Sequence, residues 1–363
     1  MRLTVAGLGL IGGSVALAAR ELGHDVTGYD PDAGAVATAL ERGALSDAAD
    51  SLDGAVVGAE LALVAGPVGE LPSLAARALE AAPDRCVVTD VGSTKLRVVD
   101  AVREHPWFVG GHPVCGSEAR GVANARADLF RGATWFLTPV PTTDPAGHRA
   151  VHGFVTSLGA RPVAVDPAAH DRLVALTSHL PHALANMLVN QAGAGRIDGH
   201  DPLAATGGSF RDMTRVAGAN PRIWVDIFLE NRTAVLDGLR EHGRRVEELA
   251  AALEREDAGY VARWIAEAAG HRRRLLETAY PVEPEQLYRL RVKLSDRPGE
   301  ISGITQALGA AGINIEDFEL HHVSAEAGGN AVILVAGKGE ADRAVELLDQ
   351  HGFAASAVAA VDA

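Results

Sequence analysis

The stretch GGHPVCGSEARG brings an imidazole and a carboxylate, His112 and Glu118, into a segment rich in glycine. Its glycines and Pro113 disfavour a regular helix or strand, so we expect a loop here. The stretch DVGSTK follows an apolar run and carries Ser93. A hydroxyl beside an imidazole suits a base that takes a proton from a substrate alcohol while hydride leaves the carbon. We therefore predict Ser93 and His112 as a catalytic pair over one pocket. The alternative is a structural role for each, with His112 only stabilising a turn.

A pair of histidines lies in SHLPHALANML. His179 and His182 are three residues apart. Pro181 is tolerated in the first turn of a helix, so we expect the pair at a helix start. Such spacing also occurs in metal sites, but no third and fourth ligand is spaced with these two. We predict no metal.

A cluster of charges lies in TGGSFRDMTR, where Arg211, Asp212 and Arg215 follow two glycines. A guanidinium here can bind a substrate carboxylate through two hydrogen bonds, and Asp212 can hold Arg215 from three residues away. The alternative is a surface ion pair of little energetic consequence.

A dinucleotide site is predicted at the start of the chain. Gly7, Gly9 and Gly12 form GxGxxG between the first apolar strand and the first helical run, and Asp30 ends the second strand. Such glycines allow a tight turn and close approach of a pyrophosphate, while the carboxylate accepts hydrogen bonds from the adenosine ribose. The carboxylate repels a 2′-phosphate and no arginine follows it directly, so we predict NAD rather than NADP. The alternative is a glycine-rich turn without a ligand.

These residues need a scaffold of alternating strands and helices. Apolar runs alternate with alanine-rich stretches, the rhythm of an α/β doubly wound parallel sheet of Rossmann type. Ligands of such sheets lie beyond the carboxyl ends of the strands, where DVGSTK and GGHPVCGSE both fall. We expect the first helix over 14–22 and assign 1–166 to this domain. The predicted strands are LTVAG, HDVTGYD, AELALVAG, RCVVTDVG, WFVGGHP, ATWFLTP and ARPVAVD.

An all-helical domain is predicted over 167–280, where strand patterns vanish. Apolar residues recur there at helical spacing over a stretch longer than an ordinary surface helix. This apolar seam needs a partner surface, either a second subunit or the core of the same chain. The seam comprises Ile223, Trp224, Ile227, Phe228, Val235, Leu236, Leu239, Val246, Leu249 and Leu253.

The end of the chain follows a third pattern. The proline-marked stretch YPVEPEQ predicts a linker over 281–286. Residues 287–363 then read as a strand, a helix, two strands, a helix and a strand. This order predicts a ferredoxin-like βαββαβ domain.

The composition limits the partners. The chain has 363 residues, 47% of them hydrophobic, which suits two or three domains. Its net charge of −14 disfavours nucleic acid and anionic membranes as partners. Cys86 and Cys115 lack the spacing of a disulfide framework or a zinc site, which fits a reducing cytoplasm. The start of the chain is too broken by glycine for a secretion signal, and no other apolar run is long enough to span a membrane.

Taken together, these stretches resemble one family, the prephenate dehydrogenases of tyrosine biosynthesis, including the enzymes that use arogenate. The resemblance covers most of the first 280 residues and rests on GLGLIGGS, DVGSTK, GGHPVCGSEARG, SHLPH, GGSFRDMTR and NPRIWVDIFLENR. The tail, with DRPGEI and GINI, resembles an ACT domain, a module that commonly binds amino acids at its dimer interfaces.

The resemblance implies roles for individual residues. His112 would take the proton of the substrate's ring hydroxyl, with Ser93 assisting it. Glu118 would lie near the pocket mouth and pair with Arg215, which would bind a substrate carboxylate. Cys115 stands where the family often has alanine, and an exposed thiol there would be sensitive to oxidation. The expected substrate contacts are Arg215, His182, His179, Glu118, Gly208 and Trp224. The expected cofactor contacts are Gly7, Gly9, Leu10, Ile11, Gly12, Asp30, Pro67, Asp90 and Gly92.

The implied activity is NAD-dependent oxidative decarboxylation of prephenate to 4-hydroxyphenylpyruvate, with arogenate as the alternative substrate. A rival from another class is a regulator that binds dinucleotide and amino acid without turnover. We expect a homodimer, with higher assembly through pairing of the ACT-like domains. This domain is expected to bind tyrosine as a feedback inhibitor, and the alternative is a dimerising module without a ligand. The expected effector contacts are Arg297, Pro298, Gly299, Asn314 and Ile315.

Overall fold

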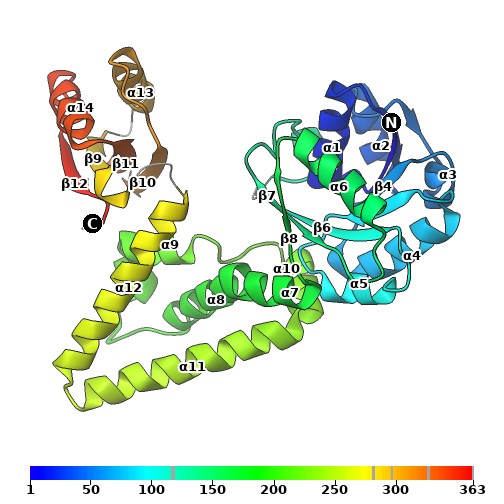
Figure 1. The fold of residues 1–363 in the computed structure, drawn as a ribbon. Helices are drawn as coiled ribbons and strands as arrows, with labels where there is room; N and C mark the ends of the chain where they lie inside the picture. The colour runs from blue at the N-terminus through cyan, green and yellow to red at the C-terminus, as the bar shows by residue number, and fades with distance from the viewer. Residues whose placement is uncertain (116–118, 280–282, 296, 325–327, 362–363) are drawn as a thin grey trace. The chain divides into compact units, whose positions relative to one another are not determined.

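The computed structural model describes residues 1–115, 119–279, 283–295, 297–324 and 328–361. The chain so described divides into two compact units, Met1–Gly243 and Arg244–Ala363. Figure 1 shows the helices and strands of each unit.

The first unit is built on one sheet. Within the described residues, eight strands lie in the order β3-β2-β1-β4-β5-β6-β7-β8. The predicted strands are confirmed, and neighbouring strands pair in parallel except that β7 runs antiparallel to β6. The expected wholly parallel sheet is therefore wrong at β7, because the described chain between β6 and β7 holds no crossover α-helix. The strands are β1 (Arg2–Ala6), β2 (Asp25–Tyr29), β3 (Asp47–Ala48), β4 (Leu61–Val64), β5 (Val87–Asp90), β6 (Phe108–Val114), β7 (Thr134–Thr138) and β8 (Arg161–Ala164).

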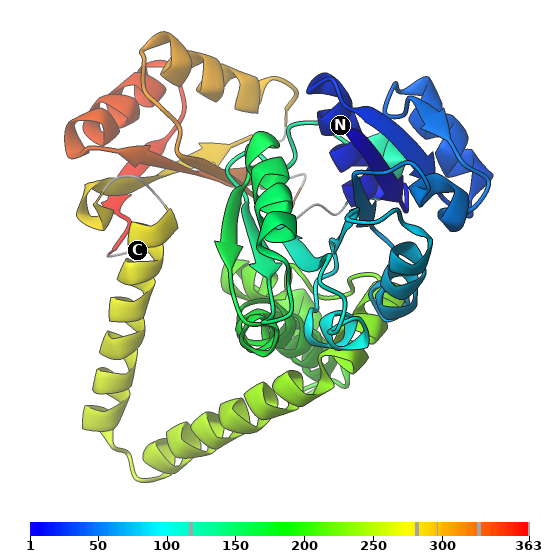
Figure 2. The same cartoon turned by 45° about the vertical axis from the view of Figure 1, so that its right-hand side comes forward.

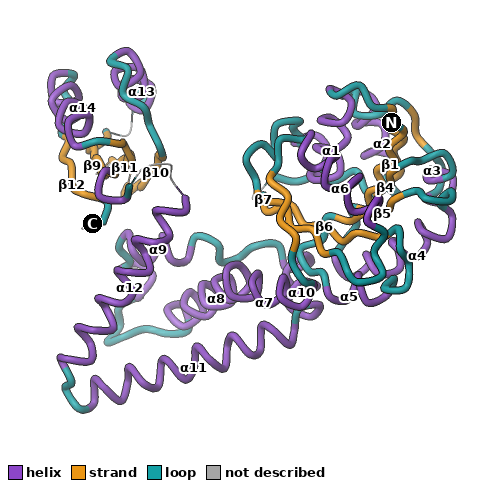
Figure 3. Tube along the Cα trace, in the orientation of Figure 1, coloured by secondary structure: helices purple, strands orange, loops and turns teal. Residues whose placement is uncertain are grey.

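Helices cover both faces of this sheet (Figure 3). On one face, α1, α2 and α6 close a core around the fully buried Phe130 and Trp135. On the other face, α3, α4 and α5 close a second core around Leu52 and Leu71. Apolar burial on both faces is the physical reason why the central strand β4 reads LALV and is buried throughout. The helices are α1 (Leu10–Glu21), α2 (Ala33–Glu41), α3 (Leu52–Val56), η1 (Val68–Glu70), α4 (Leu71–Ala81), α5 (Leu96–Ala101), η2 (Val122–Asn124) and α6 (Pro145–Ser157).

His112 lies in a strand, as the predicted strand WFVGGHP indicated, and not in the loop that its neighbouring glycines suggested. β6 continues through Gly110 and Gly111 because β7 pairs with it, with His112 opposite Phe136. A Cβ on Gly111 would lie 2.5 Å from the backbone oxygen of Asp90. The glycines therefore serve close packing of β6 on β5, and the pairing with β7 overrides their weak strand propensity.

The first helix also begins earlier than expected, at Leu10 rather than Ser14. It starts inside the glycine motif because the turn is closed by Gly9, whose carbonyl accepts the N–H of Gly13 at 2.9 Å. The N-terminal N–H groups of α1 therefore face the space next to the motif.

A continuous helical run follows the sheet. His179 and His182 lie at the start of α8 (Leu180–Gly193), as expected, but a π turn joins this start directly to α7. Pro181 lacks an N–H, and its ring would clash with the carbonyl of Thr177 in a regular α-helix; a π-helical turn accommodates it. The helices are α7 (Pro167–Val174), the π turn η3 (Ala175–His179), α8 (Leu180–Gly193), η4 (Pro202–Ala205), α9 (Gly208–Thr214), α10 (Pro221–Glu230) and α11 (Arg232–Glu254).

The apolar seam is divided between α10 and α11, which are separated at Asn231. Ile227 and Val235 are buried within the chain. Other seam residues remain exposed, and these are Ile223, Leu236, Val246 and Leu253. One part of the seam thus packs inside the chain, and another part presents apolar surface to its surroundings.

The second unit contains α12 and a ferredoxin-like domain. Its described strands form an antiparallel four-stranded sheet in the order β10-β11-β9-β12, with α13 and α14 on one face (Figure 2). The predicted βαββαβ order is confirmed; residues 281–282 of the predicted linker lie outside the described residues. The elements are α12 (Ala258–Ala279), η5 (Pro284–Gln286), β9 (Leu287–Leu294), α13 (Glu300–Ala310), β10 (Asp317–Ser324), β11 (Gly328–Ala336), α14 (Lys338–Gln350) and β12 (Ala355–Ala359).

Candidate active site

The first βα turn is shaped to receive an anion. Gly7 has a φ of 101°, and a Cβ on Gly12 would lie 1.9 Å from the Gly7 oxygen, so α1 packs directly on the turn. A Cβ on Gly9 would meet nothing within 4 Å. Open space therefore lies at Gly9, where the helix N-terminus offers free N–H groups and the positive end of its dipole. A pyrophosphate fits this arrangement.

Asp30 is oriented by the backbone at the end of β2. Its carboxylate accepts the N–H of Leu8 at 2.6 Å and the N–H of Asp32 at 2.8 Å. The side chain is only half-buried, and each carboxylate oxygen can accept a further hydrogen bond. It can therefore still receive a ribose diol. Leu10 and Ile11 are half-buried and Pro67 is exposed after β4, whereas Gly92 is buried.

Asp90 has a structural position. Its carboxylate accepts the N–H of Gly92 at 2.8 Å and the N–H of Gly111 at 3.0 Å, and it forms an ion pair with Lys95. Asp90 and Lys95 have no exposed surface, and burial lowers the pKa of Lys95. Because its partners are internal, the Asp90 side chain supports the loop after β5, and its expected contact with the cofactor stays a prediction.

His112 is poised to accept a proton. Its Nδ1 lies 2.8 Å from Nε2 of His170, and its ring is half-buried. Burial, and secondarily the positive charge that His170, Lys95 and His179 can carry, holds the pKa of His112 well below its ordinary value of 6.5. The imidazole is therefore neutral near pH 7, which is the form that a general base requires.

Two neighbours of His112 were not expected from the sequence. His170 and Asp171 are buried in α7, and His170 Nδ1 lies 2.8 Å from an oxygen of Asp171. The same carboxylate accepts the backbone N–H of Lys95 at 2.7 Å and that of Leu96 at 2.9 Å. The only signal for this pair in the sequence is that His170 and Asp171 are consecutive. Consecutive residues on a helix do not ordinarily face each other, so their hydrogen bond could not be expected.

His179 is a second neutral imidazole. It is 1% exposed, and its Nδ1 lies 3.2 Å from the side-chain nitrogen of Asn231. Burial lowers the pKa of His179 to about 4. The Asn231 amide donates, so Nδ1 of His179 accepts and its proton resides on Nε2.

His182, Trp224 and Arg215 come together beside His179. The His182 ring stacks on Trp224 with centroids 3.6 Å apart, and Trp224 meets His179 edge-on at 6.0 Å. Burial lowers the pKa of His182, and the nearby charge of Arg215 contributes in the same direction. The ring contacts and electrostatic interactions thus connect the predicted residues from His112 to Arg215.

The remaining predicted site residues are less defined. Ser93 Oγ is buried without a hydrogen-bond partner in the described structure, so its pairing with His112 stays a prediction. Gly208 begins α9 at an exposed position, and Glu118 lies outside the described residues. Cys115 is half-buried, and burial raises the pKa of its thiol to about 11, which disfavours the oxidation expected of an exposed thiol.

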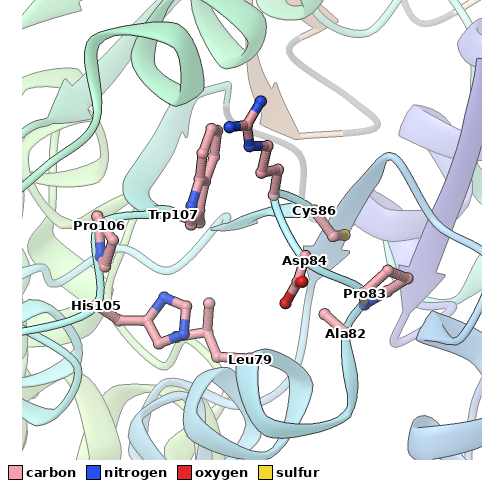
Figure 4. A pocket seen from close by; sticks show the side chains of 9 residues that line it. Leu79, Ala82, Pro83, Asp84, Cys86, His105, Pro106 and Trp107 are labelled. Carbon is pink, nitrogen blue, oxygen red and sulfur yellow. The ribbon is translucent and has the colours of Figure 1, made fainter.

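A separate hollow of about 380 Å³ lies before β5 and β6 (Figure 4). Cys86, His105 and Trp107 are among its lining residues. It opens at the amino ends of these parallel strands, the opposite edge from His112, and contains no predicted site residue. We do not assign it to the active site, because ligands of open α/β sheets bind at the carboxyl ends.

The predicted effector residues lie around the start of α13 and the turn before β10. Gly299 caps α13 with a φ of 95°, and Arg297 and Pro298 beside it are exposed. The Asn314 amide donates to Glu316 at 2.7 Å, and Ile315 packs against the core of the domain. Their role in binding an effector stays a prediction.

Among the described residues, no group of three His, Cys, Asp or Glu side chains is arranged to hold a metal ion. Nor does any helix in those ranges have the length and apolar character needed to span a membrane.

A doubly wound sheet with an anion-binding turn after β1, and a neutral imidazole on β6 of the same sheet, defines an oxidoreductase with a nucleotide-binding domain. Comparisons with known proteins agree. Residues 15–164 match the prephenate dehydrogenase nucleotide-binding domain, 166–267 the prephenate dehydrogenase dimerization domain and 288–353 the ACT domain. The chain belongs to the prephenate dehydrogenase family.

Individual relatives cover most of the chain. The prephenate dehydrogenase of Bacillus subtilis (strain 168) is 35% identical over 330 residues, 88% of this chain and 87% of that protein. The crystal structure of Synechocystis arogenate dehydrogenase has a TM-score of 0.68 at 30% identity, covering 75% of this chain and 99% of that one. The crystal structure of Aquifex aeolicus prephenate dehydrogenase in complex with hydroxyphenyl propionate and NAD+ has a TM-score of 0.71 at 27% identity. It covers 76% of this chain and 98% of that chain.

Acid should destabilise the fold through His179. Its pKa is about 4 in the folded chain against 6.5 ordinarily, so the unfolded chain binds this proton first as the pH falls. Neutral His179 therefore stabilises the folded chain fully above the unfolded pKa of 6.5. This stabilisation is lost as the pH falls from there towards the folded pKa of about 4. For this single group the free energy of unfolding should fall by about 1 kcal/mol per pH unit near pH 5.5. Urea unfolding from about pH 7.5 to 5 measures this slope.

His179→Asn keeps an acceptor for Asn231 at the Nδ1 position and removes the titration, so it should flatten that slope. His200→Gln, at an exposed position, serves as the control and should leave the slope as in the wild type. Equal slopes for His179→Asn and the wild type would contradict the assignment.

Proposed function

We propose that the protein catalyses the NAD-dependent oxidative decarboxylation of prephenate to 4-hydroxyphenylpyruvate. The observation that carries this proposal is the neutral imidazole of His112 near the carboxyl end of β6. Ligands of open α/β sheets bind at that edge. The Bacillus subtilis relative and the Aquifex aeolicus complex with NAD+ support the substrate and the cofactor.

NAD supplies the hydride acceptor when it is bound. His112 takes the proton of the ring hydroxyl while hydride leaves the same carbon. Carbon dioxide is then lost from the ring, and the proton returns to the phenolate oxygen as the ring becomes aromatic. Because its low pKa makes His112 a weak base, proton transfer should accompany hydride departure, which acidifies the hydroxyl. The aromatic product makes the reaction effectively irreversible.

Other side chains bind and orient the substrate. Arg215 binds one substrate carboxylate, and His182, stacked on Trp224, lines the same pocket. His179 offers an Nε2–H donor. Ser93, whose buried hydroxyl lacks a described partner, assists His112 or receives the substrate hydroxyl. These roles, with Glu118 at the pocket mouth, form the proposed substrate site.

Arogenate is the alternative substrate, since Synechocystis arogenate dehydrogenase is 30% identical. The absorbance of NADH formed with each compound gives kcat/KM for both substrates and so separates the two. We expect the larger value with prephenate. A larger value with arogenate would replace the proposed substrate. NAD binding without turnover of either compound would instead favour the non-catalytic regulator.

His112 and Arg215 should differ in the kinetic constant that they control. His112→Asn keeps an amide next to His170 but has no group at the Nε2 position, so kcat should fall by about 10²- to 10⁴-fold with little change in KM. Arg215→Ala removes a carboxylate contact, so KM should rise by about 10- to 100-fold with a smaller loss of kcat.

Steady-state kinetics with prephenate and NAD provide the measurement, and Arg211→Ala is the matched control for loss of a nearby positive charge. Full kcat in His112→Asn, or equal effects of the two arginine variants, would refute the assigned roles.

We also propose a homodimer formed by the helical region. The exposed seam residues Ile223, Leu236, Val246 and Leu253 support this, as does the match of 166–267 to a dimerization domain. The proposed division is 1–166 for the nucleotide, 167–280 for substrate and dimerization, 281–286 as linker and 287–363 for regulation.

Tyrosine is the proposed effector of the ACT domain, as a feedback inhibitor. The left-handed Gly299 at the start of α13 lets the backbone approach an amino-acid carboxylate, and Asn314 in the turn before β10 is a second expected contact. Calorimetry of the full chain with tyrosine, phenylalanine and tryptophan should detect binding of tyrosine and a matching loss of activity. If none of the three amino acids binds, the domain is better explained as a dimerising module without a ligand.

A further inference from the structure

Three side chains form a hydrogen-bonded line that ends at the proposed base. His112 Nδ1 lies 2.8 Å from His170 Nε2, and His170 Nδ1 lies 2.8 Å from Asp171 Oδ1. His170 has no exposed surface and Asp171 is 4% exposed. The line therefore runs from the half-buried ring of His112 into the interior.

The carboxylate end of the line determines where the protons reside. Asp171 accepts the backbone N–H groups of Lys95 and Leu96 on its two oxygens, at 2.7 and 2.9 Å. A carboxylate that accepts on both oxygens acts only as a hydrogen-bond acceptor here. Nδ1 of His170 must therefore carry a proton. In a neutral His170 ring, Nε2 is then the acceptor.

We infer that His170 and Asp171 are positioning residues that set the tautomer of His112. Because His170 Nε2 accepts, His112 Nδ1 must donate, and the lone pair of His112 is left on Nε2. A proton taken from a substrate hydroxyl then goes to Nε2. If His170 carried a second proton, His112 Nδ1 would accept instead, its own proton would move to Nε2 and the base would be blocked. This inference rests on the proposed function.

The surroundings hold the rings in this arrangement. His170 meets the Phe136 ring edge-on at 5.3 Å and the His112 ring at 5.1 Å, also edge-on. Lys95 and His179 are the other titratable groups near His112; Lys95 is paired with Asp90, and Asn231 donates to His179. Among the described side chains, His170 alone is hydrogen-bonded to His112 Nδ1.

Two amide variants of His170 separate positioning from support of the fold. His170→Gln places an amide near the former Nε2, where its oxygen can accept from His112. His170→Asn places its amide near the former Nδ1, within reach of Asp171 but not of His112. With prephenate and NAD, kcat should fall at least about tenfold further in His170→Asn than in His170→Gln, since a wrong tautomer disables a base. KM should change little in either.

A role limited to supporting Asp171 predicts the reverse order, and that order, or equal kcat values, would overturn the inference. Wild-type turnover distinguishes this result from failure of the proposed function, which would leave the unmodified protein inactive.

A second measurement does not depend on turnover. Nitrogen NMR of the full chain labelled with ¹⁵N-histidine, with His112→Asn used to assign the signals, reports which ring nitrogen carries the proton. We expect His112 Nε2 to be unprotonated in the wild type near neutral pH. A protonated Nε2 with an unprotonated Nδ1 would refute the inference even if the His170 variants failed to fold.

Discussion

One buried carboxylate, that of Asp171, joins the sheet to the helices of the first unit. It accepts two backbone N–H groups at the start of α5 and the ring nitrogen of His170. The Asp171 carbonyl accepts the Asn231 amide at 2.7 Å, which ties α7 to the residue between α10 and α11. Without the carboxylate, its buried donors would each lose a partner, at a cost of about 1–3 kcal/mol apiece. The helices after the sheet and the nucleotide-binding sheet are therefore joined through the same residue whose carboxylate orders the proposed base.

The electrostatics of the site follow from this burial. The pKa values of His112, His179 and His182 are all lowered, chiefly by burial, so these imidazoles are neutral near pH 7. Neutral rings can differ in function, because each presents either a lone pair or an N–H according to its partner. In this site the Asn231 amide makes His179 a donor at Nε2, whereas His170 makes His112 an acceptor there. In the proposed function, permanent positive charge for the anionic substrate comes separately, from Arg215.

In the helical region, the π turn around Pro181 and the exposed apolar residues of the seam lie on the helices that carry the predicted substrate contacts. The π turn that accommodates Pro181 lies between the buried face of α7, which carries His170, and the ring of His182 stacked on Trp224. Backbone irregularity of this kind is frequent at functional sites. The same region exposes apolar residues of the seam, so the proposed dimer and the proposed substrate site draw on the same helices.

Local sequence pattern was sufficient to predict much of the fold of this protein. The glycine motif, Asp30, the strands and the βαββαβ tail could all be read from the sequence, because period, turn residues and short spacing reflect interactions between near neighbours. Recognition of several motifs in order also indicated the family. The tertiary structure decided the rest. Pairing with β7 made the glycine-rich segment around His112 a strand, close packing made Asp90 a buried support, and a contact across 58 residues joined His112 to His170. Such contacts depend on where distant segments meet and on which buried groups need partners, and neither is encoded in local spacing.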